Sequence, residues 1–260
     1  MKNAIDNFKR YRFLLLELIK KDIKLKYRRS YFGIIWTLLE PILTTVVLTV
    51  VFSNMFQRGT ESFPVYILGG RLIYSYFSTT TKSALKSIRK NSAMIKKVYV
   101  PKYMYPLAVV FSGYVIFAIS LIVLLLAMLV FHVPITIYFV GILYPLFMVL
   151  IMTLGVGMIL STLAVFFRDL EYLWSVVLMF IMYCSAIFYN VEDMVKKNQQ
   201  NLWIFKWNPL YAIIKNVRNA IFGMPLDPHS CIYSFVFSFG ALTIGIWLFY
   251  KKQDEFILNI

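Results

Sequence analysis

The chain has 260 residues, of which 60% are hydrophobic and 15% charged, and its mean hydropathy is +0.71. This composition excludes a disordered chain, and 11 Gly, 9 Pro and 2 Cys exclude a collagen-like repeat and a disulfide scaffold. A net charge of +15 would favour nucleic-acid binding in a soluble protein, but here the cations flank long apolar runs, where they report membrane topology. The sequence therefore predicts an all-α integral membrane protein, folded as a single domain over residues 1–260, with no nucleic-acid partner.

Residues 1–30 precede the first apolar run and predict an amphipathic interface helix. At 100° per residue, the segment Ile5 to Lys26 gathers apolar side chains on one side and mainly basic ones on the other. The apolar side holds Phe8, Tyr11, Leu14, Leu15, Leu18, Ile19 and Leu25. Asp22 and Lys26 also fall on that side, so the stripe is imperfect. Such a helix is expected to lie in the cytoplasmic membrane surface rather than to cross the bilayer.

Six apolar runs predict six transmembrane helices, because a hydrocarbon core of about 30 Å needs about 20 helical residues. The runs are Ile34–Phe56, Phe63–Thr80, Leu107–Phe131, Tyr138–Phe167, Tyr172–Tyr189 and Cys231–Tyr250. Arg71 interrupts the second run, the fifth is short, and the fourth is long enough to tilt or to kink at Pro145. No cleavable signal peptide is expected, because a long polar and basic stretch comes before the first run.

The distribution of Lys and Arg predicts the orientation. With the N-terminus inside, 20 of these residues fall in cytoplasmic segments and 6 on the opposite side, and Arg71 lies within a span. The positive-inside rule then places both termini in the cytoplasm, as an even number of spans requires.

Two connections between spans are unusual. Residues 82–105 hold seven Lys or Arg and no acid, and Leu85, Ile88 and Ile95 have helical spacing that ends at Pro101. This segment is interpreted either as a solvated loop attracted to lipid or as a docking element for a cytoplasmic partner. Residues 190–228 are long and aromatic for an external loop, so we expect them to fold back onto the membrane as short helices that form an external gate.

Motifs for catalysis are missing from the sequence. None of the 11 glycines is followed by Lys, so the phosphate-binding loop of nucleotide hydrolases is excluded, and no G-x-S-x-G elbow occurs. His132 and His229 have no Cys or carboxylate spaced to share a metal ion. We expect no catalytic residue, metal or cofactor on this chain.

Two charges, Glu40 and Arg71, fall within predicted spans. An ionisable group in hydrocarbon costs about 2.5 to 3.5 kcal/mol on the most lenient scale, so each needs a reason. At about 1.5 Å per residue, the two positions differ in depth by roughly 9 Å, more than a direct ion pair bridges. We expect each charge to face a wet cavity or a subunit interface. Two such charges without an internal repeat are few for a proton-coupled carrier.

Aromatic residues make up 18% of the chain, and some lie away from span ends. Those of interest are Tyr74, Tyr76, Phe77, Phe180 and Tyr183. Anchoring at the membrane interface is one interpretation. The other is that they line a channel, because aromatic rings stack on sugar rings while Tyr hydroxyls bond to sugar hydroxyls.

Four segments, taken in order along the whole chain, resemble those of permease subunits of ATP-binding-cassette polysaccharide exporters. Residues 27–41 resemble the junction of interface helix and first span, residues 91–101 the coupling helix, residues 166–170 a short inner loop, and residues 208–210 the external segment before the last span. The coupling residues implied are Asn91, Ser92, Met94, Ile95, Lys96, Lys97, Tyr99 and Pro101. The phosphate of a lipid head group is expected at the basic cluster that holds Lys24, Arg28 and Arg29.

This resemblance implies a multi-pass protein of the bacterial inner membrane that pairs with a second copy of itself and with two ATPase subunits, which carry ATP and Mg. The substrate implied is a lipid-linked polysaccharide such as O antigen, capsule or teichoic acid. An ion-coupled secondary transporter or channel without an ATPase, favoured only by Glu40 and Arg71, is the alternative. A membrane scaffold or a subunit of a lipid-modifying enzyme, held by anionic lipid, is a third hypothesis.

Overall fold

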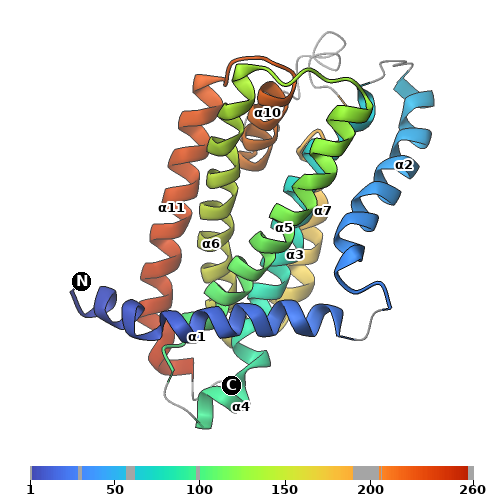
Figure 1. The fold of residues 1–260 in the computed structure, drawn as a ribbon. Helices are drawn as coiled ribbons and strands as arrows, with labels where there is room; N and C mark the ends of the chain where they lie inside the picture. Colours follow the sequence, from blue (N-terminus) through green and yellow to red (C-terminus); the bar gives the residue numbers. More distant parts are fainter. Residues whose placement is uncertain are drawn as a thin grey trace.

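The computed structural model describes residues 2–28, 31–56, 62–97, 100–189, 205 and 207–256, with no description of the side chains of residues 2–10 and 52–56. Every regular element in these ranges is helical, which confirms the all-α prediction there. The long helices form an upright bundle, and α1 (Lys2–Tyr27) crosses beneath it (Figure 1). Short α4 (Ser92–Lys97) lies below α1.

Four segments are long and apolar enough to cross a membrane: Gly33–Val51, Met104–Val130, Ile137–Phe166 and Pro228–Glu255. They contain α2 (Trp36–Phe56), α5 (Met104–Val130), α6 (Leu143–Phe166) and α11 (Pro228–Lys252), and match the first, third, fourth and sixth predicted runs within a few residues. The fourth begins as a 3-10 helix over Ile137–Ile142, just before Pro145. The fifth run is α7 (Leu170–Cys184), with 15 residues.

The second run becomes α3 (Phe63–Lys90), which is 28 residues long and runs well past the predicted end at Thr80. It contacts α2, α5, α6 and α7, so it lies inside the bundle, where its polar residues are tolerated. Leu85 and Ile88 are buried near its inner end, and Ile95 is buried in α4. The solvated-loop interpretation of residues 82–105 is therefore wrong for these three residues, because burial of their side chains holds the segment helical.

Helices α6 and α11 pack closely along their length because small residues line their contact. A Cβ at Gly155 would lie 2.4 Å from the backbone N of Leu242, and one at Gly245 would lie 2.6 Å from the carbonyl oxygen of Gly155. Only glycine fits there. Close approach of backbones is a common way to pack helices in lipid, where the hydrophobic effect between helices is lost.

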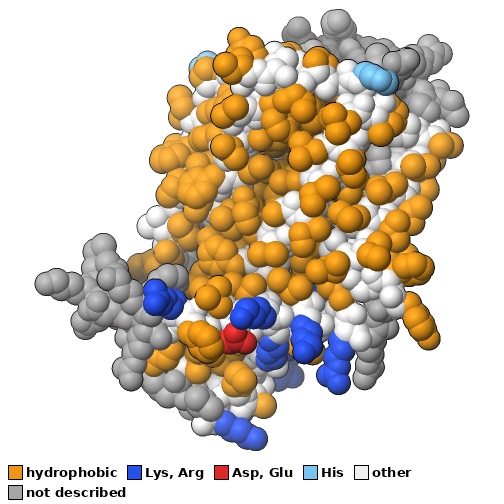
Figure 2. Space-filling model, in the orientation of Figure 1, with side chains coloured by type: hydrophobic (Ala, Val, Ile, Leu, Met, Phe, Trp, Pro, Cys, Tyr) orange, Lys and Arg blue, Asp and Glu red, His pale blue; other side chains and the backbone are white. Residues whose placement is uncertain are grey.

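Apolar side chains cover the height of the bundle, and Lys and Arg gather at the end near α1 (Figure 2). Leu15 and Leu18 of α1 are buried in one cluster with Ile88, Ile95 and Met104. The amphipathic helix is thus confirmed, but Leu25, expected on its buried side, is 44% exposed.

At the other end of the bundle, α10 (Pro209–Ile221) folds back against α11, α3 and α6. The described part of residues 190–228 thus contains one short helix, residues 190–204 and 206 lie outside the described ranges, and the expected external gate stays a prediction. In contrast to α10, helices α2 and α7 contact few neighbours and expose apolar side chains along much of their length.

Candidate functional site

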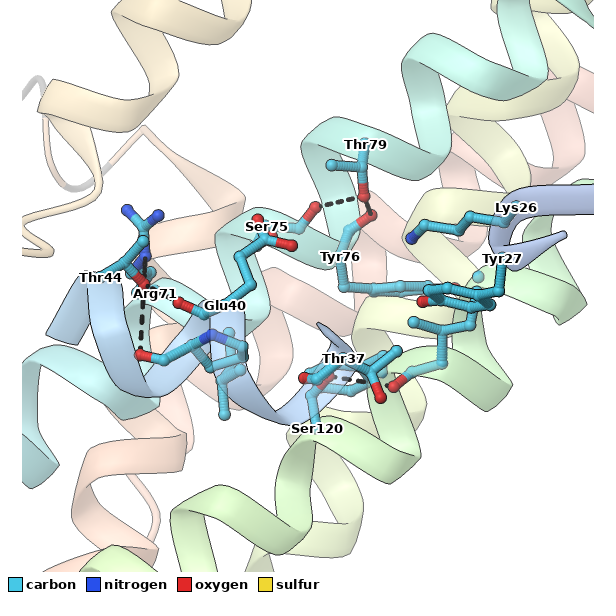
Figure 3. Close-up of a pocket in the computed structure, with 15 residues that line it drawn as sticks. Lys26, Tyr27, Thr37, Glu40, Thr44, Arg71, Ser75, Tyr76, Thr79 and Ser120 are labelled. Atoms are coloured by element: carbon cyan, nitrogen blue, oxygen red, sulfur yellow. Dashed lines mark hydrogen bonds between the residues drawn. The ribbon is translucent and has the colours of Figure 1, made fainter. Parts of the chain in front are cut away.

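A polar pocket of about 90 Å³ lies at the inner end of the bundle, between α1, α2, α3 and α5 (Figure 3). Three charged side chains line it, each from a different helix: Lys26 of α1, Glu40 of α2 and Arg71 of α3. In Figure 3 the Glu40 carboxylate points toward α3, with Arg71 to one side and Lys26 to the other. The two charges within the spans therefore share one cavity.

Arg71 reaches this pocket through the length of its side chain. Its Nε donates a hydrogen bond to Thr44 Oγ1 at 3.1 Å, and the Thr44 hydroxyl donates to the Glu40 carbonyl at 2.7 Å. Thr44 lies one helical turn beyond Glu40. The depth difference of roughly 9 Å estimated between helix positions thus overstates the separation of the charged groups, because an arginine head extends several Å from its Cα. No ion pair within 4.0 Å joins Arg71 and Glu40 in the described structure.

The field of Glu40 acts on α1. Burial lowers the pKa of Lys26, and the Glu40 carboxylate partly opposes this shift. Burial raises the pKa of Tyr27, and Glu40 raises it further. For Asp22, one turn earlier, burial raises the pKa while Lys90 and Lys21 act to lower it. The junction of α1 and α2 is thus coupled electrostatically to the pocket.

A larger cavity of about 460 Å³ adjoins the pocket and leads to the C-terminal end of α3. The two share Lys26, Thr79, Gly113 and Ile116, and the larger one extends to Ser83 and Lys90. Arg71, Ser75, Thr79 and Ser83 recur every four residues, so they form one polar stripe along α3. Polar side chains of α3 therefore continue from the pocket to the basic end of the bundle.

A second arginine, Arg218 of α10, lies at the opposite end and is 6% exposed. Its Nη1 donates to Tyr66 Oη at 2.8 Å and to the Ala186 carbonyl at 2.9 Å, and its Nη2 donates to the Ile187 carbonyl at 2.9 Å. The guanidinium carbon also lies 3.5 Å from the centre of the Tyr66 ring. Ala186 has φ +49°, a conformation that costs a non-glycine residue energy and that these bonds stabilise.

Arg218 is one of the six cations that the sequence assigns to the side opposite the cytoplasm, and sequence reasoning missed its burial. A signal was present in the sequence, because Leu210, Ile213, Ile214, Val217 and Ile221 follow helical spacing. Arg218 stands four residues after Ile214 and three before Ile221, on the same stripe. A cation on the apolar stripe of a helix indicates that buried hydrogen-bond acceptors surround it.

The five aromatic candidates occupy different environments. Tyr76 and Phe77 are buried inside the subunit, and Tyr76 stacks on Phe117 with ring centres 4.9 Å apart. Tyr74 is partly buried and donates to the Leu178 carbonyl at 2.9 Å. Phe180 and Tyr183 of α7 are 64% and 57% exposed. Of these five candidates, the α7 pair is therefore the one that presents exposed aromatic surface.

The proposed coupling residues surround α4. Ile95 is buried, whereas Met94, Lys96 and Lys97 are exposed, and Asn91 and Ser92 are partly exposed at the turn after α3. Pro101 lies just before α5, and Tyr99 lies outside the described residues. Of the basic cluster, Lys24 and Arg28 are exposed near the end of α1, and Arg29 lies outside the described residues.

A helical bundle with four segments long and apolar enough to cross a membrane, an amphipathic helix across one end and basic residues gathered there has the features of a multi-pass membrane protein. No group of three His, Cys, Asp or Glu able to hold a metal ion occurs among the residues the structure describes. The family of ABC-2 type transporters matches residues 14–222, most of the chain. The chain belongs to that family.

The chain is also similar, over nearly its full length, to curated relatives. It is 29% identical over 247 residues to the O-antigen export system permease protein RfbA of Klebsiella pneumoniae, with 94% of this chain and 93% of that protein covered. It is 27% identical to the protein of the same name in Myxococcus xanthus, with 96% of both chains covered. The polysialic acid transport protein KpsM of Escherichia coli is 23% identical, with 93% of this chain and 94% of that one covered.

Proposed function

We propose that this chain is the membrane-spanning subunit of an ATP-driven exporter that moves a lipid-linked polysaccharide, of the O-antigen type, across the bacterial inner membrane. The observation that carries the proposal is end-to-end similarity to O-antigen export permeases and to a polysialic acid transport protein. A strain without this chain should accumulate lipid-linked glycan inside and lack it on its surface, and a plasmid copy should restore export. Unchanged surface glycan in the deletion strain would contradict the proposal.

In this proposal the six spans are α2, α3, α5, α6, α7 and α11, with both termini in the cytoplasm. Helix α3 crosses inside the bundle, so Arg71 does not face lipid. Helix α7 is about 22 Å long, and the residues that follow it complete its crossing. Basic residues beneath the bundle would lie on the cytoplasmic side, as the positive-inside rule requires.

Hydrolysis of ATP occurs in a partner in this scheme, with α4 as its docking element. Burial of Ile95 anchors α4 to the bundle, and exposed Met94, Lys96 and Lys97 are available to the ATPase. The double variant Lys96→Glu, Lys97→Glu should uncouple ATP hydrolysis from export. The matched control is Lys20→Glu, Lys21→Glu, two equal charge reversals on exposed residues of α1. Normal export with retained ATPase in the α4 variant would overturn the assignment.

The basic cluster of Lys24, Arg28 and Arg29 is proposed to attract the phosphate of the lipid head group at the membrane surface. Arginine holds phosphate oxygens through two parallel hydrogen bonds, which lysine does not reproduce. The variant Arg28→Lys, Arg29→Lys keeps the charge and should reduce export if the contact is bidentate. Full export by this variant would leave simple membrane anchoring as the role of the cluster.

The glycan path is proposed to lie between two copies of the chain, along the exposed aromatic side of α7, and to be closed outside by residues 190–228. Phe180 and Tyr183 offer surfaces on which sugars stack weakly and slide. Tyr183→Ala should slow export without unfolding the bundle, and cysteines on α7 should crosslink two copies. Absence of crosslinks together with undiminished export would contradict this path. Export that continues with an inactive ATPase would instead favour an ion-coupled carrier.

A further inference from the structure

The pocket between α1, α2 and α3 holds two cations that lack a bonded anion. Lys26 and Arg71 line it together with Glu40, and the charge of Glu40 acts on both cations. No ion pair within 4.0 Å connects Glu40 to either of them in the described structure. Among the described residues that line this pocket, the Glu40 carboxylate is thus the single negative charge opposite Lys26 and Arg71, so these charged residues have a net charge of +1.

Arg71 has donors to spare. The recorded hydrogen bonds of the described residues use only its Nε, toward Thr44, although a guanidinium carries five N–H donors. Hydroxyl groups around it are directed elsewhere: Thr44 donates to the Glu40 carbonyl, and Thr79 donates to the Ser75 carbonyl at 2.6 Å. The terminal nitrogens of Arg71 and the Lys26 ammonium are therefore the donors that a ligand in this pocket would meet.

The ligand chemistry follows from charge and access. A phosphate or diphosphate carries enough negative charge to neutralise both cations, and its oxygens match the donor fork of an arginine. The cavity beneath the pocket provides entry from the cytoplasmic end of α3. On the outer side of α2, Ile42, Leu43 and Val46 are 40%, 53% and 56% exposed, which offers an apolar surface for a hydrocarbon chain next to the polar pocket.

We propose that the phosphate-bearing head group of the lipid that carries the glycan binds between Lys26 and Arg71, and that it replaces Glu40 as their counter-ion. Glu40 is thus an internal competitor: it keeps the cations balanced in the unloaded permease and repels the bound phosphate, which favours release. This inference rests on the proposed function and deepens it, since it identifies where the lipid phosphate is held within the membrane.

The test measures binding of a polyprenyl diphosphate to the full-length chain in lipid nanodiscs, with the free polyprenol and inorganic diphosphate as comparison ligands. Arg71→Gln should weaken binding of the diphosphate lipid about 10- to 100-fold, because charge-assisted bonds are lost. Glu40→Gln should tighten it about fivefold or more, because a like charge is removed. Arg12→Gln and Glu17→Gln on exposed residues of α1 are the matched controls and should change nothing.

The sign of the Glu40→Gln effect separates this proposal from a structural role, in which loss of the carboxylate would disorder the cations and weaken binding. Weaker or unchanged binding in Glu40→Gln would overturn it, as would unchanged binding in Arg71→Gln. Inorganic diphosphate binding as tightly as the lipid would also overturn it, by assigning the pocket to a soluble anion. In each case the deletion strain still decides the proposed function independently.

Discussion

Arg71 and Arg218 are two arginines within one bundle, and no carboxylate forms an ion pair with either in the described structure. Arg218 donates to three backbone carbonyls and to the Tyr66 hydroxyl while lying against the Tyr66 ring. Arg71 donates once, to a hydroxyl, and opens onto a pocket that also contains Glu40. Each guanidinium nitrogen of Arg218 thus donates to an acceptor within its own chain, whereas Arg71 donates to described residues through its Nε alone.

This difference in hydrogen bonding indicates that Arg218 holds parts of the fold together, whereas Arg71 is placed to bind a ligand. A buried cation is tolerated when its donors are satisfied, and Arg218 meets that condition by holding the end of α7 against α3 and α10. Arg71 meets it only in part, so the desolvation of its charge is incompletely offset within this chain. A charged group within a bundle whose hydrogen-bond donors are only partly satisfied is expected to bind a ligand rather than to stabilise the fold.

The largest expected effect concerns stability. Arg218→Met should lower the free energy of unfolding by about 3 kcal/mol, because buried carbonyls at Ala186 and Ile187 lose their donors. Arg71→Met, the matched change in the pocket, should alter it by less than about 1 kcal/mol. Denaturant unfolding in detergent measures both. Equal losses would break the distinction between the two arginines.

A smaller effect is expected at Asn208, which supports the same outer region. Its side-chain oxygen caps α10 at the amides of Leu210 and Tyr211, and its amide donates to Ser185 Oγ at 2.9 Å. Asn208→Ala should cost about 1 to 2 kcal/mol. Asn219→Ala, which removes one exposed bond to the Pro225 carbonyl, is the control and should cost less. Thermal unfolding that fails to separate the two variants would argue against a clamp at this end.

The smallest expected effect is pH-dependent. Burial acts to raise the pKa of Asp227, but hydrogen bonds from Lys215 and Ser230 lower it to about 2. Because the folded pKa lies below the ordinary value near 3.9, this stabilisation is present above about pH 4 and is lost as the pH falls through about 2. The pair is partly exposed, so the loss should be at most about 1 kcal/mol. Asp227→Asn should remove this pH dependence, and an identical acid profile in the variant would refute it.

The sequence predicted what depends on periodicity and run length. The bounds of α2, α5, α6 and α11 and the amphipathic pattern of α1 follow from apolar patterns, whereas the fold-back of residues 190–228 was expected from the length and aromatic content of that segment. The sequence left residues 82–105 open between a solvated loop and a docking element, so it did not predict that α3 continues to Lys90, where tertiary packing buries Leu85 and Ile88. Nor could it place Arg71 beside Glu40, because residue counting gives the height of a Cα and not the reach of a side chain.

The proposal that Arg71 binds the lipid phosphate is tested most directly by measuring ATP-dependent translocation of lipid-linked glycan by the reconstituted exporter carrying Arg71→Gln. We expect this variant to fold and assemble as the unsubstituted chain does and to hydrolyse ATP. It should export glycan at least about tenfold more slowly, because the lipid phosphate loses its main hydrogen-bond donor. Export at the unsubstituted rate, with equal amounts of folded protein in the membrane, would contradict phosphate binding by Arg71 and would leave Arg71 as a structural residue.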